Sequence, residues 1–406
     1  MLKVESTIQK ERYGLILKSI FRYKRVTRIE LSEILKLSSP ALVKYIKVLI
    51  SLGIVREMGK ASSEGGGRKS VYLEFNPEKG IAIAIAMYRT YIESGLVTIT
   101  GEVLEEYRHP IPDMLERDQL LAELFGSIEA TIAKANGLKL NQQIFGIGIA
   151  MGGHINQEKG ISYEYMFSRG WDSVQLKSIV ENRYKLPVSL VKDVNACALG
   201  EQYYGNGIGV DNFLSIWIGV SIGMGIVIDG KNYTGASGYA GELGHTRGGD
   251  EGCLCYCGHT GCLEGISSEG YILEECRKGL RKGVLSEIRN ICQCDFENIT
   301  IQQVIQAANN GDRFSRNVFE GVGEVLGRKI SDAANLFNPE LILLRGPVID
   351  GNLFLFETIK RIVMNQNLRQ ISHGLKILYS PHDNLVHLRG VGSVIVNGLI
   401  SSQERI

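Results

Sequence analysis

The run from Gly241 to Glu264, GELGHTRGGDEGCLCYCGHTGCLE, constrains the fold of this chain more than any other feature. One imidazole and three thiols lie close together within it, at His245, Cys255, Cys257 and Cys262. This is the ligand set of a closed tetrahedral zinc site. A Cys-x-Cys-x4-Cys spacing with an upstream His is dense enough to predict a bound metal, with a purely structural zinc knuckle or metal-free buried thiols as the alternatives.

Other residues of the same run keep the details open. Cys253 and His259 are close enough to replace one of the four ligands, and the residues alone do not choose among the six. Glu242 and Glu264 stand beside the metal ligands at the two ends of the run. A metal that fixes a loop also fixes its acidic side chains, which indicates a built binding site.

The composition is that of a globular protein with more than one domain. The chain has 406 residues, 44% of them hydrophobic and 22% charged, and this length favours two or three domains. No apolar stretch approaches the length of a membrane span, and the N-terminus lacks a signal-peptide core. Four of the eight Cys fall between 253 and 262, which favours metal binding in a reducing compartment. We therefore expect a cytoplasmic protein.

Charge is unevenly distributed along the chain. Residues 1–75 hold 15 Lys and Arg against 7 Asp and Glu, a net charge of +8. The remainder holds 30 basic and 37 acidic residues, a net charge of −7. A basic head on an acidic body indicates that the head binds a polyanion.

The basic head has the pattern of a winged helix-turn-helix domain, which we place at residues 1–76. Residues 8–21 have helical apolar spacing, and Thr27 with Glu30 forms a capping-box pattern that starts a second helix. Ser39 is a candidate cap and Pro40 suits the first position of a third helix that Gly53 ends. A β-rich pair of segments with a Gly-rich turn follows.

In this interpretation the helix from Pro40 enters the DNA major groove. Its first turns and the basic end of the Gly-rich wing supply the expected DNA contacts, Ser39, Lys44, Tyr45, Lys47, Arg68 and Lys69. A small helical dimerisation domain with a solvated basic face is the alternative.

From Gly80 onward, strands alternate with helices in a pattern that occurs twice. Residues 80–111 predict three strands with a turn at 100–101, followed by α/β units. A second hairpin-like pair at 213–233 precedes a long helix and the strand ELILLRG. This repetition is typical of the two-lobed, actin-like (ribonuclease H-like) fold of sugar kinases. We expect one lobe at 77–190 with about 375–406, and a second lobe with the zinc site at 191–374.

Four motifs, GYAGELGH, CYCGHTGCLE, LVKDVNACALGE and NPELILLRG, together resemble the ROK family of sugar kinases and sugar-responsive transcriptional repressors. The resemblance extends over essentially the whole chain, because repressor members carry an N-terminal winged helix before the kinase-like body. Within the family, the chain resembles the repressor branch, of the N-acetylglucosamine and xylose type.

The resemblance implies roles for individual residues. It assigns zinc to His245, Cys255, Cys257 and Cys262, with the ion holding Glu242 and Glu264 in place. It assigns sugar contacts to Glu242, His245 and Glu264, and the general base of the kinases to Asp193. Gly152 and Gly153 occupy the position of a turn on the sugar side. Lys192 replaces an Asn that contacts sugar in the family; it either pairs with Asp193 and alters ligand choice, or points to solvent.

Three departures from the family pattern fall on the ATP side. The kinases' Asp-x-Gly-Gly-Thr turn maps onto 86–90, where Ala86, Tyr88 and Arg89 replace its Asp and two Gly. Bulky residues there block the approach of backbone to phosphate. The Gly-Thr-Gly-x-Gly loop reads GVSIG at 219–223, and a Gly-Gly pair becomes Arg345-Gly346. The resemblance therefore implies a non-enzymatic regulator in which Asp193 is vestigial.

We expect a sugar-responsive repressor that binds a palindromic operator as a homodimer or homotetramer. Its partners are operator DNA and a sugar or sugar derivative, with no insertion into a membrane. An ATP-dependent sugar kinase with an accessory DNA-binding head is the main alternative. A phosphotransferase-system protein as the signal, in place of a sugar, is the other.

Overall fold

The computed structural model describes residues 7–60, 71–138, 144–249, 254–381 and 384–405. The chain divides into two compact units. The first contains residues 1–209 and 384–406, and the second contains residues 210–383. Among the helices of the described residues, none combines the length and the apolar character needed to cross a membrane.

The N-terminal part of the first unit, which we call the head (residues 7–75), consists of three helices and a small sheet with strand order β1-β3-β2. Its elements are α1 (Thr7–Tyr23), β1 (Val26–Thr27), α2 (Arg28–Leu35), α3 (Ser39–Ser51), β2 (Val55–Lys60) and β3 (Val71–Phe75). The predicted capping box starts α2: the backbone N–H of Thr27 donates to Glu30 Oε2 at 2.7 Å.

The start of α3 differs in detail from the prediction. Ser38, not Ser39, is the N-cap, and its side chain makes no capping hydrogen bond. Ser39 is the first residue of the helix, and Pro40 lies within its first turn, where a missing N–H costs nothing. Gly53 follows the helix with φ 67°, a left-handed conformation that suits glycine.

The rest of the first unit is a lobe built on a five-stranded sheet with order β12-β8-β4-β5-β6. Its strands are β4 (Ile81–Met87), β5 (Tyr91–Thr98), β6 (Val103–Pro110), β8 (Ile144–Met151) and β12 (Val188–Lys192). Strands β4, β5 and β6 form an antiparallel meander, and β8 and β12 continue the sheet in parallel. The meander confirms the three strands predicted after Gly80.

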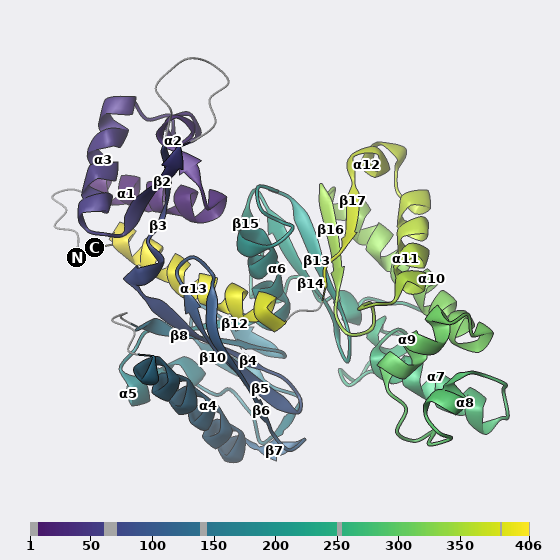
Figure 1. Cartoon of the computed structure of the whole chain (residues 1–406). Coiled ribbons are helices and arrows are strands. Elements are labelled where there is room, and N and C mark those ends of the chain that lie inside the picture. The colour runs from purple at the N-terminus through teal and green to yellow at the C-terminus, as the bar shows by residue number, and fades with distance from the viewer. Residues whose placement is uncertain (1–6, 61–70, 139–143, 250–253, 382–383, 406) are drawn as a thin grey trace. The chain divides into compact units, whose positions relative to one another are not determined.

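The alternating sequence IAIAIAM of β4 explains how this sheet is covered. Ile81, Ile83 and Ile85 belong to a core cluster with residues of α4 (Arg117–Gly137) and α5 (Leu176–Tyr184). Ala84 and Ala86 face the opposite side, toward α6 (Asp193–Tyr204) and α13 (Asn384–Arg405). Successive side chains of a strand point to opposite faces, so the small residues let two helices approach closely. Figure 1 shows α4 and α13 on opposite sides of the sheet.

Short elements complete the lobe: η1 (Pro77–Lys79), β7 (Leu115–Glu116), β9 (His154–Asn156), β10 (Ile161–Glu164) and β11 (Ser168–Arg169).

The second unit repeats the same sheet topology, with order β15-β14-β13-β16-β17. Its strands are β13 (Phe213–Ile218), β14 (Ile222–Ile228), β15 (Lys231–Asn232), β16 (Leu341–Arg345) and β17 (Lys376–Tyr379). Strands β13–β15 form the meander, and β16 and β17 extend it in parallel. The predicted repetition of a meander followed by parallel strands is therefore confirmed.

Helices and two single turns accompany this second sheet: η2 (Leu243–His245), η3 (Glu264–Ile266), α7 (Glu269–Arg281), α8 (Ile288–Ile291), α9 (Ile301–Asn309), α10 (Arg313–Phe337), α11 (Leu353–Gln366) and α12 (Arg369–Gly374). The apolar faces of α7, α9, α10 and α11 pack with the strands in one large core.

The boundaries between the lobes differ from the predicted ones at 190 and about 375. Helix α6 belongs to the first unit because it packs on α13 and the first sheet, so the boundary falls after Gly209. Strand β17 belongs to the second unit because it hydrogen-bonds to β16, and the first unit resumes at Asn384. The division of the first unit into a separate domain 1–76 and a lobe remains a prediction.

Candidate functional site

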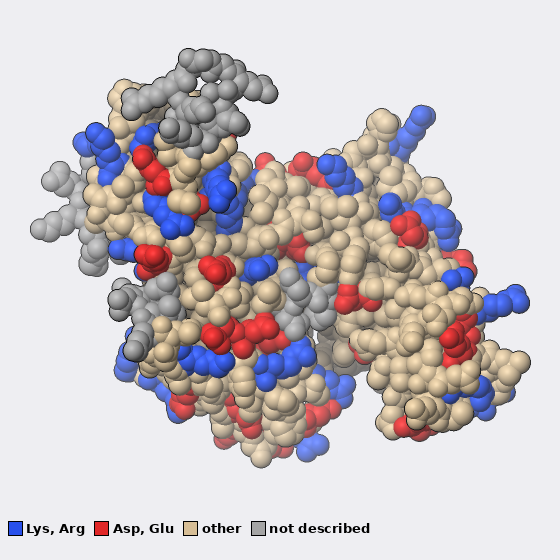
Figure 2. All heavy atoms as spheres, in the orientation of Figure 1, with Lys and Arg blue, Asp and Glu red and all other residues tan. Residues whose placement is uncertain are grey.

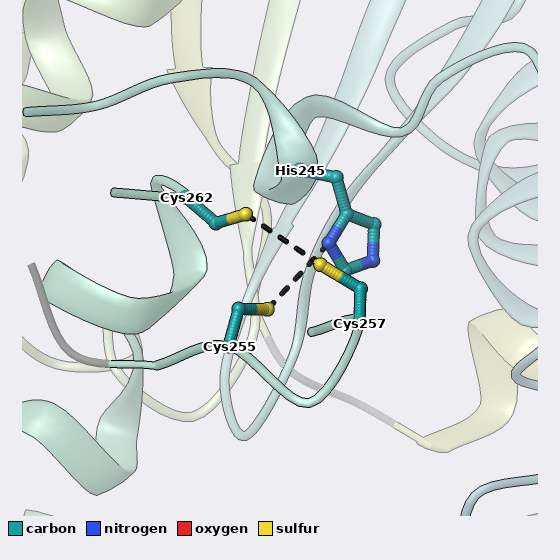
Figure 3. A group of neighbouring side chains, drawn as sticks. All are labelled: His245, Cys255, Cys257 and Cys262. Atoms are coloured by element: carbon teal, nitrogen blue, oxygen red, sulfur yellow. Dashed lines mark hydrogen bonds between the residues drawn. The ribbon is translucent and has the colours of Figure 1, made fainter. Parts of the chain in front are cut away.

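A cluster of one imidazole and three thiols lies in the second unit, at the run that the sequence singled out. The potential ligand atoms of His245, Cys255, Cys257 and Cys262 all lie within 4.8 Å of one another. The Cys255 Sγ is 3.7 Å from His245 Nδ1, and the Cys257 Sγ is 3.6 Å from the Cys262 Sγ (Figure 3).

Local backbone structure explains why these side chains meet. Turn η2 ends at His245, and isolated bridges pair Arg247 with Cys262 and Leu254 with Thr260. Gly258 closes the intervening turn with φ 85° and donates to the Cys255 carbonyl at 2.9 Å. The chain therefore folds back twice, and side chains up to 17 positions apart reach one point.

The donor set suits a tetrahedral zinc ion. Three sulfurs and one imidazole nitrogen are the soft and borderline ligands that Zn²⁺ prefers in structural sites. A backbone hydrogen bond at His259 lowers the pKa of Cys257 to about 6, which favours the thiolate form that binds metals. His259 lies beside this thiol, with Nδ1 3.6 Å from Sγ, but is not part of the four-residue group. Cys253 lies outside the described residues.

The two nitrogens of His245 face different partners. Its Nδ1 points toward the thiols, whereas Nε2 lies 2.8 Å from the Tyr256 hydroxyl and 4.0 Å from Glu242 Oε2. Such a partner on the second nitrogen fixes the orientation of a metal-ligating imidazole. Tyr256 was not identified from the sequence, because an aromatic residue between two cysteines carries no distinctive pattern.

Glu264 is buried directly beside the cluster. Only 6% of the residue is exposed, and its Oε2 accepts a 2.9 Å hydrogen bond from the Ile222 N–H. Burial raises the pKa of this carboxyl above its usual range. Glu264 begins η3 two residues after Cys262, so the metal loop and the carboxylate are held by the same short segment.

The other sugar-side residues predicted from the sequence lie in the first unit. A Cβ added to Gly152 would stand 3.3 Å from Asp193 Oδ2, so this turn passes directly beside the carboxylate. Gly153 has φ 80°, and its Cβ would be 2.2 Å from the Glu164 carbonyl oxygen. Only glycine fits at that position. Asp193 opens α6, and its Oδ1 accepts a 2.7 Å hydrogen bond from the Val194 N–H.

The structure decides one alternative for Lys192. Lys192 is only 7% exposed, so the interpretation in which its side chain points to solvent is wrong. The reason is its place at the end of β12, a buried strand that leads directly into α6. A buried cation next to Asp193 remains as the feature to explain.

Two tyrosines that sequence reasoning missed also face Asp193. Burial and the neighbouring Asp193 raise the pKa of Tyr165 far above its usual range. Burial raises the pKa of Tyr88 likewise, with smaller contributions from several neighbours, Asp193 among them. The Tyr88 ring stacks on Tyr91 at 4.4 Å and meets His387 edge-on at 5.7 Å. These contacts come from elements far apart in the chain, which no local pattern signals.

Tyr88 stands at the position that the sequence resemblance matched to the first glycine of the family's phosphate turn. The adjacent Arg89 forms an ion pair with Asp113 at 2.6 Å. In the second unit, Arg345, which the sequence resemblance matched to a glycine of the family pattern, is completely buried.

The residues predicted to contact DNA have different environments. Ser39, Lys44 and Lys47 are exposed on α3. Tyr45 is only 7% exposed, and its ring packs edge-on against Tyr13 at 5.0 Å. We therefore correct its assignment, because it belongs to the head's core and not to its surface. Arg68 and Lys69 lie outside the described residues. Figure 2 shows Lys and Arg side chains on the visible face of the head.

Comparison with known proteins identifies the family. A family model described as ROK matches residues 82–394. The chain belongs to the ROK family. This confirms the resemblance drawn from the four motifs.

The ROK proteins most similar in sequence include a "Xylose repressor" of Caldicellulosiruptor bescii, 32% identical over 391 residues that cover 96% of each chain. The "DNA-binding transcriptional dual regulator NagC" of Escherichia coli is 26% identical and covers 94% of this chain and 92% of that one. The names of these relatives match the repressor branch of the family.

Solved structures give a similar result. A ROK transcriptional regulator, described as a homolog of the E. coli MLC protein, superposes with a TM-score of 0.82 at 28% identity, over 98% of this chain and 99% of its own. A ROK glucokinase from Streptomyces griseus, solved with glucose and AMPPNP, has a TM-score of 0.69 at 23% identity, covering 78% of this chain and 99% of its own. The latter likeness shows the shared two-lobed fold.

Proposed function

We propose that this ROK protein is a sugar-responsive transcriptional repressor, a DNA-binding regulator without kinase activity. One observation carries the proposal: proteins named as repressors match the chain over nearly its full length, including the basic head. The glucokinase, in contrast, is matched over 99% of its own length but covers only 78% of this chain. The family model itself begins at residue 82, after the head.

The head is proposed to bind operator DNA as a winged helix-turn-helix. Helices α2 and α3, joined by a short turn, have the order of this motif, and β2 and β3 form the antiparallel pair of a wing. Exposed Ser39, Lys44 and Lys47 are the α3 residues proposed to reach the DNA. Arg68 and Lys69 are proposed contacts from the wing. Two heads in a homodimer or homotetramer would suit a palindromic operator.

The body is proposed to bind the sugar. Carboxylates accept hydrogen bonds from sugar hydroxyls, and Glu242, Glu264 and Asp193 are the proposed acceptors, with His245 as a further contact. Gly152 and Gly153 leave room beside Asp193 for a ligand. Buried Lys192 is proposed to set the charge at that carboxylate and hence ligand choice. The names of the relatives make D-xylose and N-acetylglucosamine the first ligands to test.

Zinc is the proposed structural cofactor, held by His245, Cys255, Cys257 and Cys262. When bound, the ion would cross-link the loop and fix both the His245 ring and the segment that carries Glu264. The hydroxyl of Tyr256 would hold the other ring nitrogen, Nε2, of the imidazole. The proposed role of this centre is to keep sugar-binding side chains in place.

The kinase alternative is disfavoured by the phosphate side of the body. Tyr88 occupies the turn at which the family pattern has a glycine, and Arg89 is engaged by Asp113. Without close backbone N–H groups, little remains to stabilise charge on a transferring phosphoryl group. Asp193 would then serve only as a hydrogen-bond acceptor for the ligand.

The test is selection of genomic DNA fragments by the full-length protein, followed by binding titrations of a selected duplex. We expect saturable, sequence-dependent binding that D-xylose or N-acetylglucosamine alters. In parallel, ATP with the same two sugars should yield no sugar phosphate. Absence of any preferred fragment, or sugar phosphorylation that Asp193→Asn abolishes, would reject the proposal.

A further partner, the cellular location and the oligomeric state complete the proposal. A phosphotransferase-system protein is a candidate signal in place of a sugar, and a pull-down with this protein as bait tests it. Operator binding places the proposed site of action in the cytoplasm. Light scattering of the purified chain distinguishes a dimer from a tetramer.

A further inference from the structure

The head contacts the body through an aromatic cage around Lys24. The Lys24 Nζ lies 3.5 Å from the ring centroid of Tyr204, 4.5 Å from that of Phe21 and 5.7 Å from that of Tyr203. Phe21 belongs to α1 of the head, whereas Tyr203 and Tyr204 are the last two residues of α6. The Phe21 and Tyr203 rings pack at 4.5 Å, so the cage joins the head to α6.

Lys24 is unusual in both backbone and environment. It follows α1 with φ 62°, a left-handed conformation that is uncommon for a lysine. Its Nζ is buried and has no hydrogen-bond partner among the described residues. The ring faces attract an ammonium, but an ammonium buried without hydrogen bonds loses more by desolvation. Burial accordingly lowers the pKa of Lys24 to about 6.

The charged groups around the cage do not offset this burial. Facing it from the surrounding elements are Arg22, Arg25, Glu74, Glu102 and Arg389. Glu74 pairs with Arg56 at 2.7 Å and with Arg25 at 3.4 Å. Arg389 donates to the Gly101 carbonyl at 3.1 Å. A cavity of about 390 Å³, lined in part by Lys24, gives water a place beside the cage.

The body side of the contact is rigid. The Tyr204 ring lies against the turn at Gly101, where an added Cβ would come within 2.0 Å of it. The Tyr203 hydroxyl accepts a hydrogen bond from Asn397 of α13 at 3.2 Å. Movement at this joint is therefore expected on the head side, at Lys24 and Phe21, and not on the side of α6.

We propose that Lys24, with Phe21, Tyr203 and Tyr204, forms a breakable latch that holds the head on the end of α6 and opens when the amine takes up a proton and water. Closed, the latch buries aromatic surface but leaves the amine without a partner. Open, the amine recovers its hydration and its charge. These opposing contributions bring the two states close in free energy, which is the condition for a switch.

The regulatory meaning of the latch rests on the proposed function. Helix α6 begins at Asp193, the proposed sugar contact, and ends about 18 Å away at Tyr204. It packs on α13 with unusually close backbones: a Cβ on Gly390 would lie 1.8 Å from the Ala196 carbonyl oxygen. A stiff helix pair thus connects the proposed effector residue to the latch on the DNA-binding head.

The latch predicts a specific pH dependence. The closed form binds fewer protons than the open form, because the amine keeps its ordinary pKa of 10.5 only when released. Raising the pH from about 7 to about 9 therefore favours the closed form by up to about tenfold per pH unit. Burial raises the pKa values of Tyr203 and Tyr204, which keeps both phenols neutral.

Hydrogen exchange of the full-length protein, without DNA or sugar, tests the proposal. The measured quantity is the amide protection factor at the end of α1, which corrects for the intrinsic effect of pH on exchange. In the wild type it should rise up to about tenfold per pH unit between about pH 7 and 9. Lys24→Met should raise it by at least about a hundredfold at pH 7 and remove the pH dependence, because the open form of the variant gains no proton.

Lys18→Met is the matched control, since it removes an exposed lysine from α1, the helix that Lys24 follows, and should leave the wild-type profile intact. A wild-type protection factor that does not change with pH would overturn the latch. So would a Lys24→Met variant with the same pH dependence as the wild type. Either result leaves the repressor proposal standing. Conversely, a protein that binds no preferred DNA but shows the profile keeps the latch and loses the proposed function.

Discussion

At the scale of single residues, the cluster in the second unit makes the sharpest prediction. Cys257→Ser should reduce bound zinc from about one ion per chain to near zero and lower the unfolding temperature, because a structural ion contributes directly to folding. Metal analysis and thermal unfolding measure both effects. Cys294→Ser changes an exposed cysteine outside the cluster and should retain the ion. Full zinc content in Cys257→Ser would contradict the proposed ligand set.

Two adjacent glycines separate a structural from a binding role. Gly153→Ala places a Cβ 2.2 Å from a carbonyl oxygen in a left-handed conformation, and should cost about 3 kcal/mol of unfolding free energy. Gly152→Ala meets only Asp193 Oδ2 at 3.3 Å. It should leave denaturant unfolding nearly unchanged and weaken sugar binding in a calorimetric titration. Equal stability losses in the two variants would contradict this distinction.

At the scale of elements, the α6–α13 pair depends on close approach. Gly390→Ala should destabilise the first unit by about 3 kcal/mol, since its Cβ would collide with the Ala196 carbonyl oxygen. Gly398 lies on the same helix with nothing within 4 Å of an added Cβ. Gly398→Ala should therefore stabilise by up to about 1 kcal/mol through helix propensity. Denaturant unfolding of both variants measures these changes. A Gly390→Ala variant as stable as the wild type would contradict the close packing of α6 on α13.

The helices and strands also show which features of the fold can be predicted from local sequence. The alternation in IAIAIAM and the capping box at Thr27 predict strand and helix because both follow from local geometry. Tyr45 was misassigned although Leu42, Ile46 and Leu49 share its buried face, a helical spacing that the sequence already contains. The lobe boundaries were misplaced for another reason. The long-range packing of α6 on α13 and the pairing of β17 with β16 set them, and no local signal reports either interaction.

The candidate site likewise contains some residues that the sequence predicted and others that it did not. The four proposed metal ligands lie in one short run of the sequence, so their spacing was informative. Tyr88, Tyr165 and Tyr256 act through contacts that only the folded chain creates, and a lone tyrosine carries no motif. Burial of Lys192 likewise comes from its place at the junction of β12 and α6 in the folded chain, which the sequence alone left open.

At the scale of the whole molecule, the basic head predicts salt-dependent DNA binding. Lys44→Ala or Lys47→Ala should each weaken binding and reduce the slope of log affinity against log salt by about 0.9 for each phosphate that is no longer neutralised. Fluorescence anisotropy across a salt series measures the slope. Lys159→Ala removes an exposed lysine from the lobe and should have no effect. Unchanged slopes in both head variants would contradict the proposed docking.

The most direct test of a sugar-responsive repressor is the affinity for a selected duplex, measured by anisotropy with and without saturating D-xylose or N-acetylglucosamine. We predict that one of these sugars lowers the affinity by about 5- to 150-fold, the usual range of allosteric coupling. The duplex should lower the affinity for that sugar by the same factor, because coupling is reciprocal. An affinity for DNA that neither sugar changes, in a protein that binds one of them, would contradict the account.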